Sequence, residues 1–397
     1  MCNINKILSL SLLLLTLIIM GCANSPKREP VPAELTNDVN VAGIPEARFW
    51  GNEYPKFAKD RIQNASDQEL KEFLPEIYGK PHNYLAISGG GAHGAYGAGI
   101  LYGWTQSGTR PEFTMVTGIS TGALAAPFAF LGSKYDELLK EVYTTTKTDD
   151  VLRKRWILSA VFSDAIADTD PMAKTIAKYI TPQVIEEIAQ AHLGGRRLYI
   201  GTVNLDASRS VIWSIGAIAI SDHPEKVSLI HDIMRASASI PVAFPPVNIE
   251  VEAGGKKYIE AHVDGGTGSQ VFVYPAMIDW EQITDRLKVP GDPNVYVIRN
   301  SYIDAEYEAI EYGLISIAGR TINSLIRTQG NGDLYEIYAL CKRDSNQFHL
   351  AYIPRSFNEE PAEEFDPIYM TKLFDVGYEE ALHGYEWHKG PPGFEGE

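Results

Sequence analysis

The chain has 397 residues, of which 45% are hydrophobic and 22% are charged, as is ordinary for one large globular domain or two modest ones. The formal net charge of −16 at pH 7 argues against a nucleic-acid partner, because phosphate binding requires a basic surface. The same charge argues against electrostatic attraction to an anionic bilayer.

The first residues have the pattern of a bacterial targeting segment. After one lysine comes an apolar run over residues 7–20, and a glycine and Cys22 follow it. The run is too short and too near the start for a bilayer-spanning helix. The letters IMGC that end at Cys22 resemble the lipobox of bacterial lipoproteins, in which the cysteine is acylated, although Met20 is bulkier than the residue usual there. The alternatives are an ordinary secretory signal and an anchor helix.

Acylation of Cys22 would hold the protein on a membrane without help from its charge, since more than one lipid chain gives stable anchoring. Ala23 stands where an Asp would retain a lipoprotein at the inner membrane, so the expected location is the bacterial cell envelope, lipid-anchored at the outer membrane. Cys2 leaves with the signal, and only Cys341 then remains unmodified. An internal disulfide and a cysteine-based metal site are therefore excluded.

The composition divides the chain into four parts. Residues 1–21 are the predicted signal peptide. Residues 22–79 hold a proline-rich tether and a short helix at 66–74, which begins with a capping box from Ser66 to Glu69. The main domain covers residues 80–350, and residues 351–397 are a C-terminal extension whose last stretch is expected to be loose.

Apolar periodicity predicts the elements of the main domain. It indicates strands at 83–88, 112–118, 197–205, 209–216, 256–266, 294–300 and 347–353. It indicates helices at 93–106, 119–132, 133–146, 171–180, 182–192, 225–239, 305–327 and 332–341. Strands that alternate with helices predict an α/β fold with a central, largely parallel sheet.

The segment Gly118-Ile119-Ser120-Thr121-Gly122 fits G-x-S-x-G, the nucleophile elbow. That motif needs a strand before it and a helix after it, and the predicted elements supply both. The glycines are required because the serine lies on a strained turn, where a Cβ on either side would collide with the neighbouring strand or helix. The alternative is a turn of small residues in which Ser120 caps the helix.

A glycine loop precedes the elbow and has two interpretations. Gly89-Gly90-Gly91-Ala92-His93-Gly94 also fits G-x-G-x-x-G, the dinucleotide fingerprint. That interpretation needs an acidic residue at the end of the next strand, but this strand ends without one and Glu112 lies at its beginning. The loop can instead aim backbone N–H groups at the oxyanion of an acyl-transfer reaction.

Asp264-Gly265-Gly266 follows a strand at the end where open α/β sheets place catalytic groups. A serine nucleophile needs a base, and Asp264 can serve if a dry pocket makes the carboxylate basic enough. His262 would share a strand face with Asp264, so a Ser–His pair is the alternative.

Four blocks in this order resemble the patatin-like phospholipases: GGGAHGAYGAGIL (89–101), GISTGAL (118–124), ASASIPVAFPPV (236–247) and DGG (264–266). The resemblance covers about residues 80–350. It implies a three-layer fold in which helices flank the sheet, and an acyl hydrolase domain with a Ser–Asp dyad.

Carried over by position, the resemblance makes Ser120 the nucleophile and Asp264 the general base. The loop from Gly89 to Gly94 becomes the oxyanion hole. The family usually has Arg or Lys where this chain has His93, so the charge at that position is expected to depend on pH, since His titrates near neutrality. No metal and no cofactor is implied.

The resulting hypothesis is a membrane-tethered carboxylic ester hydrolase that cleaves phospholipids or related lipids. Apolar segments at 123–132 and 240–247 are candidates for the lining of an acyl-chain pocket or for ordinary core. The other hypotheses are a dinucleotide-binding protein and a catalytically idle lipoprotein that only binds lipid.

Overall fold

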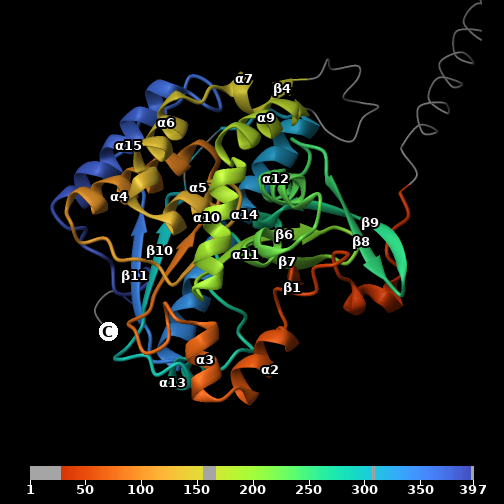
Figure 1. Ribbon diagram of the computed structural model, residues 1–397. Helices are drawn as coiled ribbons and strands as arrows, with labels where there is room; N and C mark the ends of the chain where they lie inside the picture. Colours follow the sequence, from red (N-terminus) through yellow and green to blue (C-terminus); the bar gives the residue numbers. More distant parts are fainter. Residues whose placement is uncertain (1–27, 155–166, 306, 308, 395–397) are drawn as a thin grey trace, which may run out of the picture.

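The computed structural model describes residues 28–154, 167–305, 307 and 309–394 (Figure 1). The predicted signal peptide and the predicted acylation site at Cys22 lie outside the described residues.

A mixed sheet of nine strands forms the centre of the described chain. Five consecutive strands that end at one edge of the sheet are parallel, and antiparallel strands continue the sheet on the other side. The main path of the sheet is β1 (Arg48–Trp50), β7 (Arg209–Ser214), β6 (Arg197–Asn204), β3 (Met115–Gly118), β2 (Asn83–Ile87), β10 (Asn294–Arg299) and β11 (Gln347–Tyr352). A hairpin of β8 (Val247–Ala253) and β9 (Lys256–Asp264) joins β6. The predicted α/β class with a largely parallel central sheet is confirmed.

Side chains alternate between the two faces of the sheet, and each face has its own core. Leu85 and Ile87 of β2 belong to one hydrophobic cluster, whereas Tyr84 and Ala86 belong to the other. The first face packs against α4 (Gly94–Gln106), α5 (Thr121–Leu131), α6 (Asp136–Thr145), α9 (Asp170–Tyr179), α10 (Pro182–Leu193), α11 (Ile215–Ile220), α12 (Lys226–Ser237) and α15 (Pro367–Leu382). The second face packs against α2 (Lys56–Asn64), α3 (Asp67–Phe73), α13 (Trp280–Arg286) and α14 (Leu314–Arg343).

In Figure 1, α4, α6 and α15 lie together at the upper left, and α2, α3 and α13 lie together at the bottom. The predicted capping box of α3 is present, with Ser66 and Glu69 bonded reciprocally. Shorter elements complete the described chain: η1 (Ala33–Asp38), η2 (Gly91–His93), η3 (Ser133–Tyr135), η4 (Gly265–Thr267), α7 (Thr148–Val151), β4 (Arg153–Lys154) and β5 (Ala167–Asp168).

Strands β3 and β9 meet end to end along one edge of β6. Strand β3 runs parallel to β6 and its last residue, Gly118, pairs with Ile200. Strand β9 runs antiparallel to β6 and its last residue, Asp264, pairs with Thr202. Strand β7 occupies the opposite edge over the same stretch of β6. The carboxyl ends of two strands that are far apart in sequence therefore arrive two residues apart on β6.

Helices α4 and α15 pack at backbone distance because of their glycines. A Cβ added to Gly99 would lie 2.0 Å from the Phe374 carbonyl oxygen, and one added to Gly377 would lie 2.4 Å from the Tyr96 carbonyl oxygen. Gly99 and Gly103, which follow the glycine loop in sequence, therefore serve this helix contact.

The structure differs from the predicted elements at the C-terminal end. The two helices expected at 305–327 and 332–341 are one helix, α14, which continues through Gly330, where an added Cβ would lie 2.2 Å from Arg299 Nη2. The last stretch of the chain is not loose as far as it is described. Trp387 packs on Trp104 and Tyr296, with ring centroids 4.8 and 5.0 Å apart.

Candidate active site

Ser120 lies between β3 and α5 on a strained turn, with φ 55° and ψ −126°. The flanking glycines are sterically required, as the motif predicts. A Cβ on Gly118 would lie 2.4 Å from the Gly122 carbonyl oxygen, and one on Gly122 would lie 2.2 Å from the Ile87 carbonyl oxygen. Ser120 begins helix α5 without acting as a side-chain cap, so the alternative of a capping serine is not what the geometry shows.

The last residue of α12 and the segment after it hold the elbow and Asp264 in place. The Ser120 N–H donates to Ser237 Oγ at 3.0 Å, and the Ser237 hydroxyl donates to the Gly201 carbonyl oxygen at 2.7 Å. The Asp264 N–H donates to the Ser239 carbonyl oxygen at 2.9 Å. From the sequence, Ser237 and Ser239 were noted only as members of the segment 236–247, with no role of their own. Their alternation with alanine is the one signal that marks them as small, closely packed residues.

Asp264 is 4% exposed, and its Oδ1 accepts from the Gly266 N–H at 2.7 Å. Its Oδ2 has no partner of standard hydrogen-bond geometry among the described residues. Burial raises the pKa of the carboxyl to about 7, and the nearby Ser120 hydroxyl and the Gly266 N–H oppose that rise. Asp264 therefore combines two properties of a general base, a pKa near neutrality and a place beside a serine.

The glycine loop packs directly against the elbow. A Cβ on Gly89 would lie 3.2 Å from Ser120 Cβ, and one on Gly90 would lie 2.0 Å from the Asn300 carbonyl oxygen. Gly90 has φ 152° and Gly91 has φ 55°, so both need glycine's conformational freedom.

Availability of the loop amides differs from residue to residue. The Gly89 N–H already donates to the Gln270 carbonyl oxygen at 3.1 Å. The amides of Gly90 and Gly91 donate to no group among the residues described. In the predicted oxyanion loop, the backbone N–H groups of Gly90 and Gly91 are therefore free to donate to a ligand. Gly91 and its neighbour Ala92 line the cavity that contains Ser120.

His93 is partly buried and lies between two aromatic rings. Its ring centroid lies 5.8 Å from that of Tyr302 and 5.9 Å from that of Tyr369. Desolvation, and to a lesser extent the positive charge of Arg299, lower the pKa of His93 to about 4. The expectation that this position titrates near neutrality is wrong, because distant segments bury the ring and keep it uncharged.

A buried cation, Arg299, lies near His93. Arg299, the last residue of β10, is 1% exposed, and its Nε and Nη1 have no hydrogen-bond partner among the described residues. The carboxylate that favours its charge is Asp333, which accepts from the backbone N–H groups of Gln270 and Val271. Sequence reasoning missed Arg299, since a lone arginine after a strand carries no motif.

His262 is bonded away from the elbow. Its Nε2 pairs with Glu260 Oε2 at 2.9 Å, its Nδ1 pairs with Thr202 Oγ1 at 2.9 Å, and Glu260 also pairs with Arg48. Both ring nitrogens are occupied, so the geometry does not favour the alternative Ser–His pair.

An apolar cavity of about 210 Å³ opens on Ser120. Both apolar segments singled out in the sequence contribute to it, through Leu124 from one and Ile240 and Phe244 from the other. Further lining side chains come from several helices of the same face: Val142, Tyr143, Met172, Ile176 and Met370. The cavity is suited to a hydrocarbon chain attached to a group at Ser120.

The dinucleotide interpretation gains no support from the geometry. Glu112 precedes β3, and its exposed carboxylate pairs with Arg196 at 3.0 Å. No carboxylate follows β3, where a ribose would need one.

Within the described ranges, no group of three or more His, Cys, Asp and Glu side chains is arranged to hold a metal ion. No helix in the described part of the chain combines the length and the apolar character that crossing a bilayer requires.

Comparison with known proteins gives a family match and several distant structural likenesses. Residues 85–277 match the family model described as patatin-like phospholipase. The structure is similar to VipD from Legionella pneumophila, with 12% identity, a TM-score of 0.38 and coverage of 76% of this chain and 67% of that chain. It is also similar to full-length ExoU of the Pseudomonas aeruginosa type III secretion system, solved in complex with SpcU, with 12% identity, a TM-score of 0.33 and coverage of 78% and 54%. No curated protein matches the chain.

Proposed function

We propose that the chain hydrolyses carboxylic esters of phospholipids or related lipids with Ser120 and Asp264, because its residues 85–277 match the patatin-like phospholipases, a family of lipid acyl hydrolases. The observation that carries the proposal is the pairing of a serine on a strained elbow with a buried carboxyl whose pKa is raised to about 7. An apolar cavity that opens on the same serine supports a lipid substrate.

The proposed reaction has two steps through one acyl-enzyme. Asp264 takes the proton of the Ser120 hydroxyl as its oxygen attacks the ester carbonyl, and the proton passes to the leaving alcohol as the ester bond breaks. Water then attacks the acyl-enzyme, Asp264 takes a proton from it, and Ser120 regains that proton as the fatty acid leaves. The free amides of Gly90 and Gly91 are the candidates for binding the oxyanion in both steps.

The direct test is labelling with a fluorophosphonate, which reacts with an activated serine. Ser120→Ala should abolish labelling, and Asp264→Asn should reduce its rate by at least about 100-fold, in the range of general-base effects. Ser228→Ala is the matched control, since Ser228 is an exposed serine that donates to the carbonyl oxygen of Glu225. Equal labelling of the wild type and Ser120→Ala would refute the assignment of Ser120 as the nucleophile. Absence of labelling in the folded wild type would favour an idle, lipid-binding protein.

We also propose that acylation of Cys22 tethers the enzyme to the outer membrane, as the lipobox-like letters at its N-terminus indicate. Metabolic labelling with an alkyne-tagged fatty acid should mark the wild type and leave Cys22→Ala unmarked. Sucrose-gradient separation of inner and outer membranes then tests whether the protein is located in the outer membrane. A Cys22→Ala variant that still carries the tag would refute acylation at this residue.

A further inference from the structure

A second apolar cavity lies on the opposite face of the sheet from Ser120. It has a volume of about 140 Å³ and lies under α2 and α13. Tyr84 and Met115 form part of its wall from the sheet, and both belong to the hydrophobic cluster of the second face. Ser120 and Asp264 are not among its lining residues, so the mechanism above makes no use of it.

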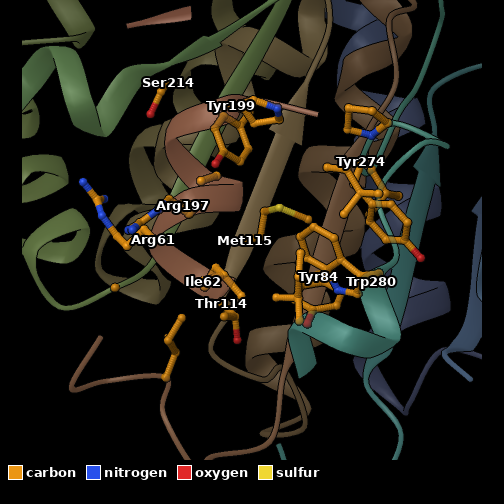
Figure 2. Close-up of a pocket in the computed structure, with 18 of the residues that line it drawn as sticks. Arg61, Ile62, Tyr84, Thr114, Met115, Arg197, Tyr199, Ser214, Tyr274 and Trp280 are labelled. Carbon is orange, nitrogen blue, oxygen red and sulfur yellow. The ribbon is translucent and has the colours of Figure 1, made fainter. Parts of the chain in front are cut away.

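The cavity has an aromatic end and a basic end (Figure 2). Tyr84, Tyr274 and Trp280 lie at one side of the view, Met115 lies near the middle, and Arg61 and Arg197 lie at the other side. The Tyr274 and Trp280 rings are stacked with centroids 4.3 Å apart, and Tyr84 meets Trp280 edge to face. These contacts give the aromatic end a fixed shape.

The positive charge at the basic end exceeds the negative charge. Arg61 is paired with Glu46, with Nη2 and Oε1 2.7 Å apart. Arg197 has no carboxylate within ion-pair distance in the described chain, and its Nη1 donates only to the carbonyl oxygens of His192 and Arg196. Two guanidinium groups therefore share one carboxylate.

The other groups near Arg197 do not supply the missing negative charge. His192 also lines the cavity, and burial together with Arg197 and Arg61 lowers its pKa to about 3, so it is neutral. Arg197 itself is half-buried, and desolvation lowers its pKa. An unpaired guanidinium beside an apolar cavity is complementary to a carboxylate with a hydrocarbon tail.

We propose that this cavity binds a medium-chain fatty acid, with its carboxylate on Arg197 and its tail against Trp280. The volume is close to that of an engineered apolar cavity of roughly 150 Å³ that holds benzene, so about six carbon atoms fit in the buried part. The fatty acid is the class of product that the proposed hydrolase releases, but binding at this site does not depend on Ser120 being a nucleophile.

Quenching of tryptophan fluorescence by ω-bromo fatty acids tests the site in the Ser120→Ala protein. A bromine at the end of the tail should quench Trp280, and the quenching should disappear in Trp280→Phe. No tryptophan lines the cavity at Ser120, so binding of the probe in that cavity should not quench Trp280. Acids of about six to ten carbons form the probe series, and the ω-bromo alcohol of equal length tests the need for the carboxylate.

Arg197→Gln should weaken binding of the acid by about tenfold or more, as expected for loss of a charge-assisted contact, and leave binding of the alcohol unchanged. Arg197→Lys should restore part of the affinity. Arg355→Gln is the matched control, since its side chain is 76% exposed and pairs with Asp304 outside the cavity. If Arg197→Gln fails to fold, Ala58→Phe decides the question, because it fills the cavity from α2 and should abolish quenching.

Three results would overturn the proposal: quenching that persists in Trp280→Phe, equal affinity of the acid in Arg197→Gln, or equal binding of alcohol and acid. Tighter binding of an alkyl phosphate than of the acid would also contradict the proposed ligand, because it would show that the site prefers a phosphate headgroup to a carboxylate. Failure of this binding proposal can be distinguished from failure of the proposed hydrolase activity, since labelling of Ser120 by fluorophosphonate is measured independently.

Discussion

At the scale of single residues, the candidate site depends on what buries each titratable group. Asp264 is buried and His93 is packed between aromatic rings, with opposite consequences for their charge. Burial raises the pKa of the acid to about 7 and lowers the pKa of the imidazole to about 4. At neutral pH the site therefore has a half-ionised carboxyl and an uncharged His93, and the fixed positive charge nearby belongs to Arg299.

We expect the titration of Asp264 to appear in both activity and stability. The base must be ionised, so the rate of fluorophosphonate labelling should rise through an apparent pKa near 7. The folded protein holds the Asp264 proton up to about pH 7, whereas the unfolded chain loses it near 3.8. The folded state thus binds more protons between these values, and this group makes stability fall as pH rises from about 4 to 7.

The variant Asp264→Asn cannot ionise and isolates that effect. It should be more stable than the wild type at pH 8 by up to about 4 kcal/mol, the free energy of a shift of roughly three pKa units. The gap should close below about pH 4, where the Asp264 carboxyl is neutral in the unfolded chain as well as in the folded protein. Urea unfolding at several pH values measures it, and a gap that does not change with pH would contradict the raised pKa.

At the scale of elements, glycines determine how closely helices approach one another and the loop. Gly99 lies where α4 meets the backbone of α15, and Gly330 makes room for Arg299 beside α14. Neither position is part of a catalytic motif. Both nevertheless act on the site, since α4 begins directly after the glycine loop and Arg299 ends the strand beside it.

Gly99→Ala should destabilise the protein by about 1–3 kcal/mol or more, as overpacked sites do, because its Cβ would meet a carbonyl oxygen of α15. Gly332→Ala is the matched control. No atom lies within 4 Å of its added Cβ, so alanine should stabilise α14 by about 0.5–1 kcal/mol. Thermal unfolding distinguishes the two, and a neutral Gly99→Ala would show that the helices can separate without cost.

Sequence reasoning located the local parts of the site and missed the parts that come from distant segments. The elbow at Ser120 was predictable because its glycines are needed by its own turn. The backbone contacts of Ser237 and Ser239 were not, since they act through backbone groups and leave no chemical signature. The pKa of His93 depends on Tyr302 and Tyr369, and no local pattern connects these residues.

At the scale of the whole molecule, the C-terminal extension is part of the main fold. Helix α15 covers α4, and a bridge between Leu350 and His388 adds the tail to the edge of the sheet. The sequence predicted a loose end because glycine and proline are frequent there. The aromatic rings of the same stretch outweigh that signal once Trp104 and Tyr296 offer them a surface.

Trp387→Ala should therefore destabilise the whole domain rather than free a tail. The side chain is half-buried, so we expect a loss of about 2–3 kcal/mol, less than the roughly 3–5 kcal/mol of a fully buried tryptophan. Tyr312→Ala is the control, since Tyr312 is 97% exposed and should be neutral. A Trp387→Ala protein with unchanged urea unfolding would restore the interpretation of a loose end.

The end-to-end meeting of β3 and β9 on β6 also bears on how the protein folds. The two strand ends bring Ser120 and Asp264 together only after β6 has paired with both strands, one of them from a much later part of the chain. Contacts between segments so distant in sequence form slowly, because the loop between them must close first. During refolding, helical circular dichroism should return before fluorophosphonate labelling does, and reactivity at Ser120 then reports the completion of the sheet.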